Sequence, residues 1–208
     1  SSPLTLALLS NKLSEANLLS KSSLKEVNDG DVIKIGKFEV EFIPVTHSVP
    51  HAFAASYTTK AGTVVHSGDF KIDHSPIDGR RTDLARFGEI GNTKNVVLLM
   101  SDSTGAEKPG TTGSESSVKT SIDRIFLEHS DKRIVVSTFA SHIHRIIQIV
   151  ESAIANGRKV AFLGRSLHTN LEVVKKLKIY EIAKKHLIDI EEIDNFANDK
   201  ICIIATGS

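Results

Sequence analysis

The spacing of apolar residues changes near residue 102, and this change divides the chain into two halves. The first half opens with a predicted helix over Leu4 to Leu13 and continues in short apolar runs separated by turn residues, a pattern typical of β-strands. The extended runs are Phe38 to Pro44, Ala52 to Thr58, Thr63 to His66 and Val96 to Met100, with turns at Asn28 to Asp31 and at Ala61-Gly62. The first half is therefore predicted to form a β-rich meander with a mixed or antiparallel sheet.

The second half alternates short apolar runs with longer segments in which apolar residues recur three and four positions apart. Helices are predicted over Ser117 to His129, Ser141 to Ala155, Leu171 to Ile179 and Ile182 to Leu187, and strands over Ile134 to Val136, Val160 to Leu163 and Ile201 to Ala205. Strands that are connected through helices pair in parallel, with the helices on the faces of the sheet. The sequence thus predicts an α/β chain whose second half is a small doubly wound domain.

Length and composition exclude few classes of protein. A chain of 208 residues allows one large domain or two small ones, and a formal charge of +1 neither supports nor excludes a polyanionic partner such as RNA.

The single cysteine, Cys202, lies in an apolar run and is predicted to be a core residue, which fits a reducing, cytoplasmic setting. No apolar span of about 18 residues and no secretory signal is present, so we expect no membrane helix. The chain lacks an initiating methionine and stops just after a strand, so we expect both ends to be truncated.

Three side chains that bind metals or protons follow predicted strands of the first half. His47, Asp69 and Asp102 each stand beside hydroxyl groups or glycine, and Asp102 follows Val96 to Met100, which we expect to be a buried strand. If these strands share a sheet, the three side chains converge at one edge, and imidazole with carboxylate is a ligand set that suits zinc or manganese. The alternative is purely local: a histidine that caps a loop, an aspartate that starts a turn and an aspartate that caps a helix. Spacing alone leaves both interpretations open.

Polar clusters also follow the strands of the second half. They comprise Ser137, Thr138, Ser141, His142, His144 and Arg145, then Gly164-Arg165-Ser166, and finally Thr206-Gly207-Ser208. The histidines of the H-x-H pair would point about 200° apart on a helix, so a shared metal ion is not expected there. Hydroxyl, guanidinium and amide groups at successive strand ends predict an edge that binds a polyanion, with simple helix capping as the alternative. Other basic residues are interpreted as a solvent-exposed face: Lys71, Arg80, Arg81, Arg86, Lys175, Lys176, Lys184 and Lys185.

Several of these segments occur in a characteristic order. They are Val45-Thr46-His47-Ser48-Val49-Pro50, His66-Ser67-Gly68-Asp69-Phe70-Lys71, Asp83-Leu84-Ala85-Arg86, Ser101-Asp102-Ser103-Thr104 with Ala106-Glu107 and Pro109-Gly110, Ser137-Thr138-Phe139-Ala140-Ser141 with His144-Arg145, Gly164-Arg165-Ser166, and Thr206-Gly207-Ser208. From about Pro3 onward the chain closely resembles the bacterial ribonuclease J family, in the β-CASP branch of the metallo-β-lactamase superfamily.

The resemblance implies a fold and an activity. The fold would be a partial metallo-β-lactamase αββα sandwich over residues 1–104, followed by most of a β-CASP domain over residues 105–208 with a parallel sheet flanked by helices. The activity would be that of a cytoplasmic, homo-oligomeric hydrolase that degrades single-stranded RNA from its 5′-monophosphate end and also cleaves internally. Two zinc or manganese ions would activate the attacking water.

The resemblance also implies roles for individual residues. His47 and Asp69 match metal ligands, and Asp102 matches an acid that orients a histidine. Ser137, Ser141, His142, His144, Arg145, Arg165 and Ser166 would face RNA, although His142 stands where the family more often has asparagine.

The family's H-x-H-x-D-H motif and its later histidines are not in the sequence, so we expect an incomplete ligand set, no dinuclear site and no activity in these 208 residues. Alternative interpretations are a non-catalytic RNA- or partner-binding module and, less well matched, a hydrolase of small esters.

Overall fold

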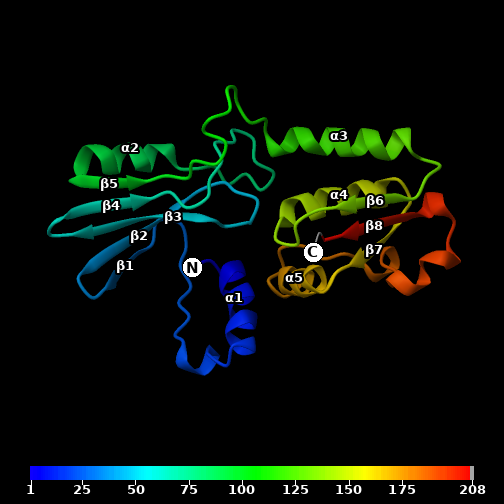
Figure 1. Ribbon diagram of the computed structural model, residues 1–208, viewed down its shortest axis with the longest axis horizontal. Coiled ribbons are helices and arrows are strands. Elements are labelled where there is room, and N and C mark those ends of the chain that lie inside the picture. The colour runs from blue at the N-terminus through cyan, green and yellow to red at the C-terminus, as the bar shows by residue number, and fades with distance from the viewer. Residues whose placement is uncertain (207–208) are drawn as a thin grey trace. The chain divides into compact units, whose positions relative to one another are not determined.

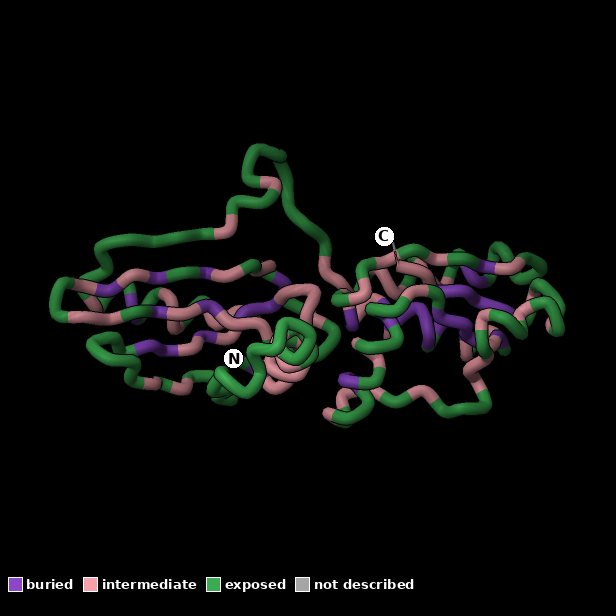
Figure 2. The backbone as a smooth tube through the Cα atoms, turned by 60° about the horizontal axis from the view of Figure 1, so that its bottom comes forward, coloured by how far each residue is buried: buried purple, intermediate pink, exposed green. Residues whose placement is uncertain are grey.

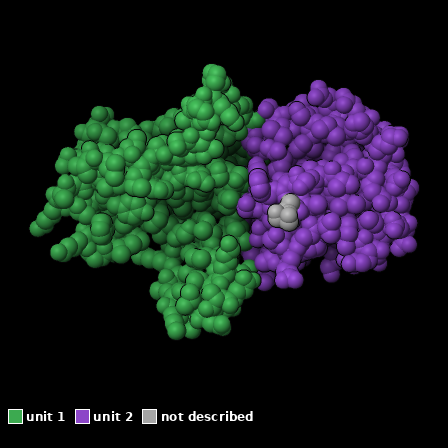
Figure 3. Space-filling model, viewed as in Figure 1, with its two compact units in different colours: residues 1–114 green, residues 115–208 purple. Residues whose placement is uncertain are grey.

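The computed structural model describes residues 1–206, which fall into two compact units: unit 1 is Ser1–Ser114, and unit 2 comprises the described residues from Glu115 onward (Figure 3). The strand-end cluster predicted at the end of the chain therefore has Gly207 and Ser208 outside the described residues. The domain boundaries that the family resemblance implies, residues 1–104 for the metallo-β-lactamase part and 105–208 for the β-CASP part, remain a prediction.

Unit 1 is built on a five-stranded mixed sheet. Its strands are β1 (Val32–Ile35), β2 (Phe38–Pro44), β3 (Phe53–Thr59), β4 (Gly62–His66) and β5 (Val96–Met100), in the spatial order β1-β2-β3-β4-β5 (Figure 1). The first four pair antiparallel, whereas β5 pairs parallel to β4 because helix α2 (Leu84–Thr93) returns the chain to the starting end of the sheet. The predicted meander is confirmed.

Helix α2 covers the sheet of unit 1 through Ile90. This side chain lies in the core cluster of Ile43, Val45, Ala54 and Val65, which come from β2, β3, β4 and the residue after β2. Asp83 caps the helix by accepting the amide of Arg86 at 2.9 Å. The predicted N-terminal helix is α1 (Pro3–Glu15), capped by Ser2 and followed by a short 3₁₀ helix, η1 (Leu19–Lys21).

Strand β5 differs from the sequence-based expectation. We predicted a buried strand, but all five of its residues are exposed, and Leu99 is the most exposed at 62% (Figure 2). The reason is its position in the sheet: β5 is an edge strand with a single neighbour, β4, so its apolar side chains lack partners that a central strand would have. Apolar composition alone cannot distinguish a central strand from an edge strand.

Two arginines that we interpreted as solvent-exposed instead join segments of unit 1. The side chain of Arg80 donates to the carbonyl oxygens of Val45 and Ala52, at 2.9 and 2.8 Å, and pairs with Asp29. Arg86 donates from Nη2 to Oε2 of the buried Glu41 at 3.0 Å. The interpretation was wrong for both because a guanidinium has five donors that can bridge segments far apart in sequence.

Replacing Glu41 with glutamine is expected to lower the free energy of unfolding by about 1–3 kcal/mol at pH 7, because it removes a carboxylate that Arg86 and Lys94 share. The hydrogen bond from Arg86 holds the pKa of Glu41 below its ordinary value of 4.5. A lowered carboxyl pKa stabilises the fold above the unfolded value, and the benefit is lost as pH falls through the folded value. Urea unfolding at pH 7 and below pH 4.5 should therefore show a difference between the two proteins that shrinks in acid. The exposed Glu39→Gln is the control, and an equal loss from both changes would contradict a specific role for Glu41.

Unit 2 contains a three-stranded parallel sheet. Strands β6 (Ile134–Ser137), β7 (Lys159–Leu163) and β8 (Ile201–Ala205) are arranged with β8 between the other two, as Figure 1 shows. Helices α3 (Glu115–Glu128), α4 (Ile143–Ala155) and α5 (Arg165–Lys176) connect or flank the strands. Residues Ile201 to Ile204 of β8 are all buried, as expected for a central parallel strand covered on both faces (Figure 2). The mixed α/β fold class predicted from the sequence is confirmed.

The two predicted elements after β7 differ in detail. Helix α5 begins at Arg165, six residues before the predicted start, because Gly164 at φ +125° lets the chain turn directly from the strand into the helix. The helix predicted over Ile182 to Leu187 is wrong: only the 3₁₀ turn η2 (Lys184–His186) forms, and Leu187 makes a parallel bridge to Val160 of β7. Two further 3₁₀ helices, η3 (Ile190–Asn195) and η4 (Asn198–Lys200), lead into β8, and Ile190, Ile193 and Phe196 pack on the sheet.

Arg158 is the largest fully buried side chain of unit 2, with 2% of its surface exposed. Its Nη1 donates to the carbonyl oxygens of Lys132 and Ile201, at 2.6 and 3.1 Å, and its Nη2 donates to those of His129 and Ser130, at 2.9 and 3.3 Å. Three of these carbonyls follow the C-terminus of α3, where backbone oxygens lack helical partners and the helix dipole favours a cation. The guanidinium thus joins α3 to the strand β8.

The predicted core position of Cys202 is confirmed, since the side chain is fully buried and burial raises the pKa of its thiol to about 12. Over residues 1–206, no helix is both long enough and apolar enough to cross a bilayer.

Candidate functional site

The strand ends of unit 1 that carry His47, Asp69 and Asp102 meet at one edge of the sheet. Strands β2 and β4 run in the same direction because each is antiparallel to β3, and β5 is parallel to β4. Their carboxyl ends therefore lie on the same side, which is where the sequence places the three residues. The convergence that we expected if the strands shared a sheet is present.

A pocket of about 400 Å³ brings His47 and Asp69 together. His51 and His66 line the same pocket, and the other lining residues come from α1, β2, β3, the Gly68 turn and the residues just before α1 and β3. The carboxylate of Asp69 is exposed and the imidazole of His47 is half-buried, with its Nδ1 3.4 Å from the hydroxyl of Ser48. Both side chains are therefore open to a ligand that enters the pocket.

Asp102 stands next to this pocket. It lines a second hollow together with Asp69 and His66, and its amide donates to the hydroxyl of Ser67 at 2.8 Å. Its carboxylate accepts the amide of Thr104 at 2.9 Å and that of Phe70 at 3.5 Å. The hydrogen bonds from Thr104 lower the pKa of Asp102, and the nearby His47 lowers the same pKa by a smaller amount. The carboxylate is therefore ionised at neutral pH and able to accept a further hydrogen bond.

The loop that carries Asp69 depends on glycine at position 68. Gly68 has φ +61°, and a Cβ atom built on it would lie 2.7 Å from the carbonyl oxygen of Phe53. Such a distance leaves no room for a side chain, so the sharp turn from β4 into Asp69 requires glycine. The close approach of the two backbones fixes the start of the Asp69 loop against β3.

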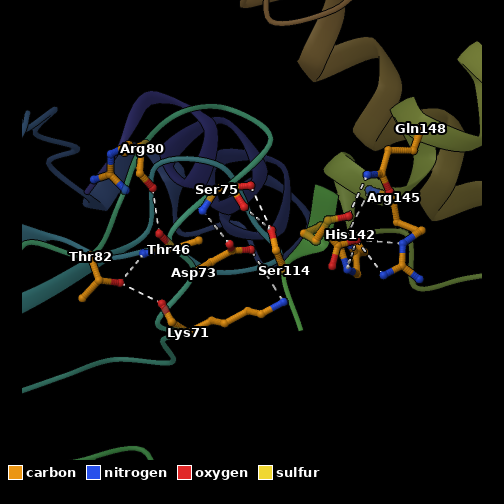
Figure 4. A network of polar contacts seen from close by, with 11 residues as sticks. Thr46, Lys71, Asp73, Ser75, Arg80, Thr82, Ser114, His142, Arg145 and Gln148 are labelled. Atoms are coloured by element: carbon orange, nitrogen blue, oxygen red, sulfur yellow. Dashed lines mark hydrogen bonds and ion pairs between the residues drawn. The ribbon is translucent and has the colours of Figure 1, made fainter. Parts of the chain in front are cut away.

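The loop of His47 is fixed by a set of hydrogen bonds around Thr46 (Figure 4). The amide of Thr46 donates to the hydroxyl of Thr82 at 2.9 Å, and the hydroxyl of Thr46 donates to the carbonyl of Arg80 at 2.7 Å. The hydroxyl of Thr82 in turn donates to the carbonyl of Lys71 at 2.9 Å. These hydrogen bonds connect the residue before His47 to the segment of Arg80 and Thr82, and this segment to Lys71, two residues after Asp69. The sequence gives no indication of this connection.

The ligand types fit a divalent metal ion only in part. An imidazole and a carboxylate in one pocket match the donors that zinc and manganese accept in proteins. Among residues 1–206, however, no three histidine, cysteine, aspartate or glutamate side chains are grouped closely enough to hold an ion. His47 and Asp69 can supply part of a coordination shell, and a hydrolytic zinc ion normally takes three protein ligands.

In unit 2 the carboxyl ends of the three parallel strands form a second polar edge. The amide of Thr138, just after β6, donates to the carbonyl of Ala205 at 3.0 Å, and that of Thr206 donates to the carbonyl of Leu163 at 3.1 Å. Ser137 and Ser141 are exposed at this edge. Arg165 and Ser166 are exposed in the first turn of α5, where Gly164 brings the chain so close to Thr206 that a Cβ atom would lie 2.5 Å from its hydroxyl.

His142 caps helix α4 instead of chelating a metal with His144. Its Nδ1 accepts the amide of Arg145 at 3.3 Å, so the proton of the neutral ring lies on Nε2, 3.9 Å from Oε1 of Glu115. Burial lowers the pKa of His142, and the nearby Glu115 offsets this only in part. The ring is therefore neutral at pH 7. His144 follows in the first turn of the helix and is half-buried.

The guanidinium of Arg145 is already paired within unit 2. It donates to Oε1 of Glu115 from Nε and from Nη2, at 2.8 and 2.6 Å, and Gln148 donates to the backbone carbonyl of Glu115 at 3.1 Å (Figure 4 shows Arg145 and Gln148). A phosphate at Arg145 would have to compete with this carboxylate. Sequence reasoning missed Glu115 because nothing in its spacing links the start of one helix to the start of the next.

The family model and the three relatives described below are all named ribonuclease J. Residues 131–208 match the family model described as ribonuclease J, β-CASP domain. The chain is 40% identical over 207 residues to ribonuclease J of Helicobacter pylori (strain ATCC 700392 / 26695), which covers 99% of the chain and 30% of that protein. It is 41% identical to ribonuclease J of Mycobacterium tuberculosis (strain ATCC 25618 / H37Rv), covering 100% of the chain and 36% of that protein. Ribonuclease J of Synechocystis (strain ATCC 27184 / PCC 6803 / Kazusa) is also 41% identical, with 99% and 32% covered.

Among solved structures, a protein of unknown function from Enterococcus faecalis V583 has a similar fold. The TM-score is 0.69 with 16% sequence identity, over 100% of this chain and 52% of that one. The chain spans about a third of the length of the ribonuclease J relatives. The resemblance to the ribonuclease J family that the motifs predicted is confirmed over the whole chain, and residues 131–208 match the β-CASP domain of that family.

Proposed function

We propose that this chain is part of a metal-dependent ribonuclease of the ribonuclease J type. The observation that carries the proposal is the meeting of His47, Asp69 and Asp102 at one edge of the unit 1 sheet, in a chain about 40% identical to ribonuclease J throughout. Residues 1–104 would be part of a metallo-β-lactamase domain and residues 105–208 most of a β-CASP domain. The RNA would be single-stranded.

The residues of unit 1 would hold the metal ions and keep them in place. Two zinc or manganese ions, when bound, would supply a water of lowered pKa and positive charge beside the phosphate. His47 would hold a metal ion through its imidazole, and Asp69 would do so through its exposed carboxylate. The ionised Asp102 would accept a hydrogen bond from a metal-binding histidine and fix its orientation, a role in which the acceptor must stay unprotonated.

The residues of unit 2 would bind the phosphates of the RNA. Ser137, Ser141 and Ser166 offer exposed hydroxyls, and Arg165 offers an exposed guanidinium at a helix N-terminus. His142 and His144 would contribute through their position in the first turn of α4, and Arg145 after partial release from Glu115. We further propose that the enzyme acts both from the 5′-monophosphate end and internally, that it is a cytoplasmic homo-oligomer, and that these 208 residues alone do not cleave RNA.

The RNA contact can be tested with the chain itself. Single-stranded RNA should bind with an affinity that falls with salt, since released counterions contribute to binding. Arg165→Ala should weaken binding several-fold and make the slope of log K against log salt shallower by about 0.7, the effect of one lost phosphate contact. Lys175→Ala, in the last turn of the same helix, is the matched control and should change neither.

Three outcomes would count against the proposal. RNA binding that is absent at low salt, or that does not depend on salt, would contradict phosphate contacts. Equal effects of Arg165→Ala and Lys175→Ala would contradict a role for the strand-end edge. Robust cleavage by this chain with Zn²⁺ or Mn²⁺, lost in His47→Ala, would show that the 208 residues hold a complete catalytic site.

A further inference from the structure

Phe139 is the most exposed large apolar side chain among residues 1–206, with 80% of its surface open to solvent. Burying a phenylalanine is worth about 1.5–3 kcal/mol, so a fold that leaves one outside forgoes a substantial stabilisation. The residue belongs to the connection between β6, which ends at Ser137, and α4, which begins at Ile143. It therefore stands at the polar edge of unit 2.

The loop that carries Phe139 is held on both sides. The carbonyl of Phe139 accepts the amide of His142 at 3.0 Å, and the carbonyl of the next residue, Ala140, accepts the side-chain amide of Asn170 in α5 at 2.8 Å. On the other side, Thr138 is bonded to the end of β8. The ring is thus presented from an ordered turn, which lowers the entropy lost when a ligand covers it.

The surroundings of the ring determine what can cover it. Ser137, Thr138 and Ser141 flank it along the chain, and Arg165 and Ser166 stand at the carboxyl end of β7, two strand spacings from β6, or about 10 Å. A protein partner that covered the ring with aliphatic side chains would have to desolvate these hydroxyls and the guanidinium. A ligand with a flat apolar face joined to an anionic, hydrogen-bonding backbone suits both the ring and its neighbours.

We propose that Phe139 is a stacking platform for one base of single-stranded RNA, an inference that rests on the proposed function. Bases stack on aromatic side chains in single-strand binding proteins, and the contact is tolerant of sequence because every base has a π-face. The polar groups around Phe139 hold the backbone, and the ring fixes the position of one nucleotide relative to it.

The test measures binding of short single-stranded RNA to the wild-type chain and to Phe139→Ala. The substitution should weaken binding by about five- to tenfold. It should leave the salt dependence unchanged, because no charge is lost. Leu127→Ala is the matched control, since Leu127 is also largely exposed, at 67%, but lies in α3. Both variants should melt like the wild type, because the side chains that they remove are mostly outside the core.

A second variant gives a direct signal of the contact. The chain has no tryptophan, so Phe139→Trp would introduce a single one at the proposed platform. Its affinity for RNA should equal that of the wild type or exceed it, and its fluorescence should change when RNA binds. An RNA with abasic sites at every position should bind Phe139→Ala and the wild type equally, since no base is left to stack.

The outcomes separate this inference from the proposed function. Wild-type RNA binding that Phe139→Ala leaves unchanged would overturn the stacking platform alone. The same conclusion would follow from an unchanged fluorescence of Phe139→Trp at saturating RNA, or from a loss that persists with abasic RNA. No RNA binding by the wild type at low salt would overturn the proposed function and the stacking platform with it.

Discussion

Replacing Asp69 with alanine in the metal-dependent ribonuclease proposed above is expected to lower the rate of RNA cleavage by about a thousandfold or more. A bound cation contributes several kcal/mol of transition-state stabilisation, and each 1.4 kcal/mol corresponds to about a factor of ten in rate. His47→Ala should have an effect of the same order, because both side chains open into the same pocket. Asp102→Asn should cost only about 10- to 100-fold, since this residue would act through a histidine. Single-turnover cleavage of a labelled RNA is the measurement.

The relative size of these rate losses distinguishes residues that bind a metal ion from a residue that acts through a histidine. Glu39→Gln is the control, because it removes a charge near the opposite end of β2, where the side chain is exposed. It should leave cleavage unchanged. RNA affinity should also be retained in all four variants if the phosphates are bound by unit 2. If Asp69→Ala and His47→Ala cleave RNA at the wild-type rate, the metal site proposed here is wrong and a non-catalytic RNA-binding role of this segment becomes the better proposal.

Replacing Arg158 with methionine is expected to lower the free energy of unfolding of unit 2 by about 3–5 kcal/mol. The change removes the guanidinium donor from four backbone carbonyl oxygens around an almost fully buried side chain. The carbonyl of His129 keeps the amide of Lys132 at 3.1 Å, whereas those of Ser130, Lys132 and Ile201 lose the donor that Arg158 supplies. Each orphaned buried group costs about 1–3 kcal/mol, and loss of the contact with the ring of Phe126, 5.6 Å from the guanidinium carbon, adds to this. Hydrogen exchange of the β6 and β8 amides, which reports on unit 2 specifically, should become faster in the variant.

Two further variants distinguish a role of the guanidinium from a general effect of lost charge. Arg158→Lys keeps the charge but cannot reach four acceptors at once, so it should recover only part of the stability. Arg124→Met removes an exposed arginine from α3, with 70% of the side chain open to solvent, and should change stability by no more than about 0.5 kcal/mol. Wild-type exchange rates in Arg158→Met would show that the carbonyls find other donors.

The pairing of Arg145 with Glu115 bears on how unit 2 could meet RNA. The carboxylate of Glu115 binds the guanidinium in the way that a phosphate oxygen would, so one of the phosphate ligands expected from the sequence already has a competitor. Arg165, by contrast, is exposed at the start of α5. Replacing Arg165 therefore tests the RNA contact more directly than replacing Arg145, because no carboxylate of unit 2 competes for it in the hydrogen bonds and ion pairs shown for the described residues.

Much of the fold follows from local patterns. The meander of unit 1 and the alternating strands and helices of unit 2 were predicted because hydrophobic period and turn residues act over a few positions. The failures have causes outside the local pattern: Ile182 to Leu187 is apolar enough for a helix, yet only the 3₁₀ turn η2 forms there, and Leu187 bridges to Val160 of β7. In β5, the same apolar composition that predicted burial occurs at an exposed edge.

For the candidate site, the sequence by itself determined the chemical groups: an imidazole and two carboxylates after strands, and hydroxyls with guanidinium groups after other strands. Only the tertiary structure decided which groups meet. It placed His47, Asp69 and Asp102 at one edge, paired Arg145 with Glu115, buried Arg158 among carbonyls and left Phe139 outside. The physical reason is that strand order, sheet edges and the partners of long charged side chains depend on segments distant in sequence, which compete for the same contacts only once the chain has folded.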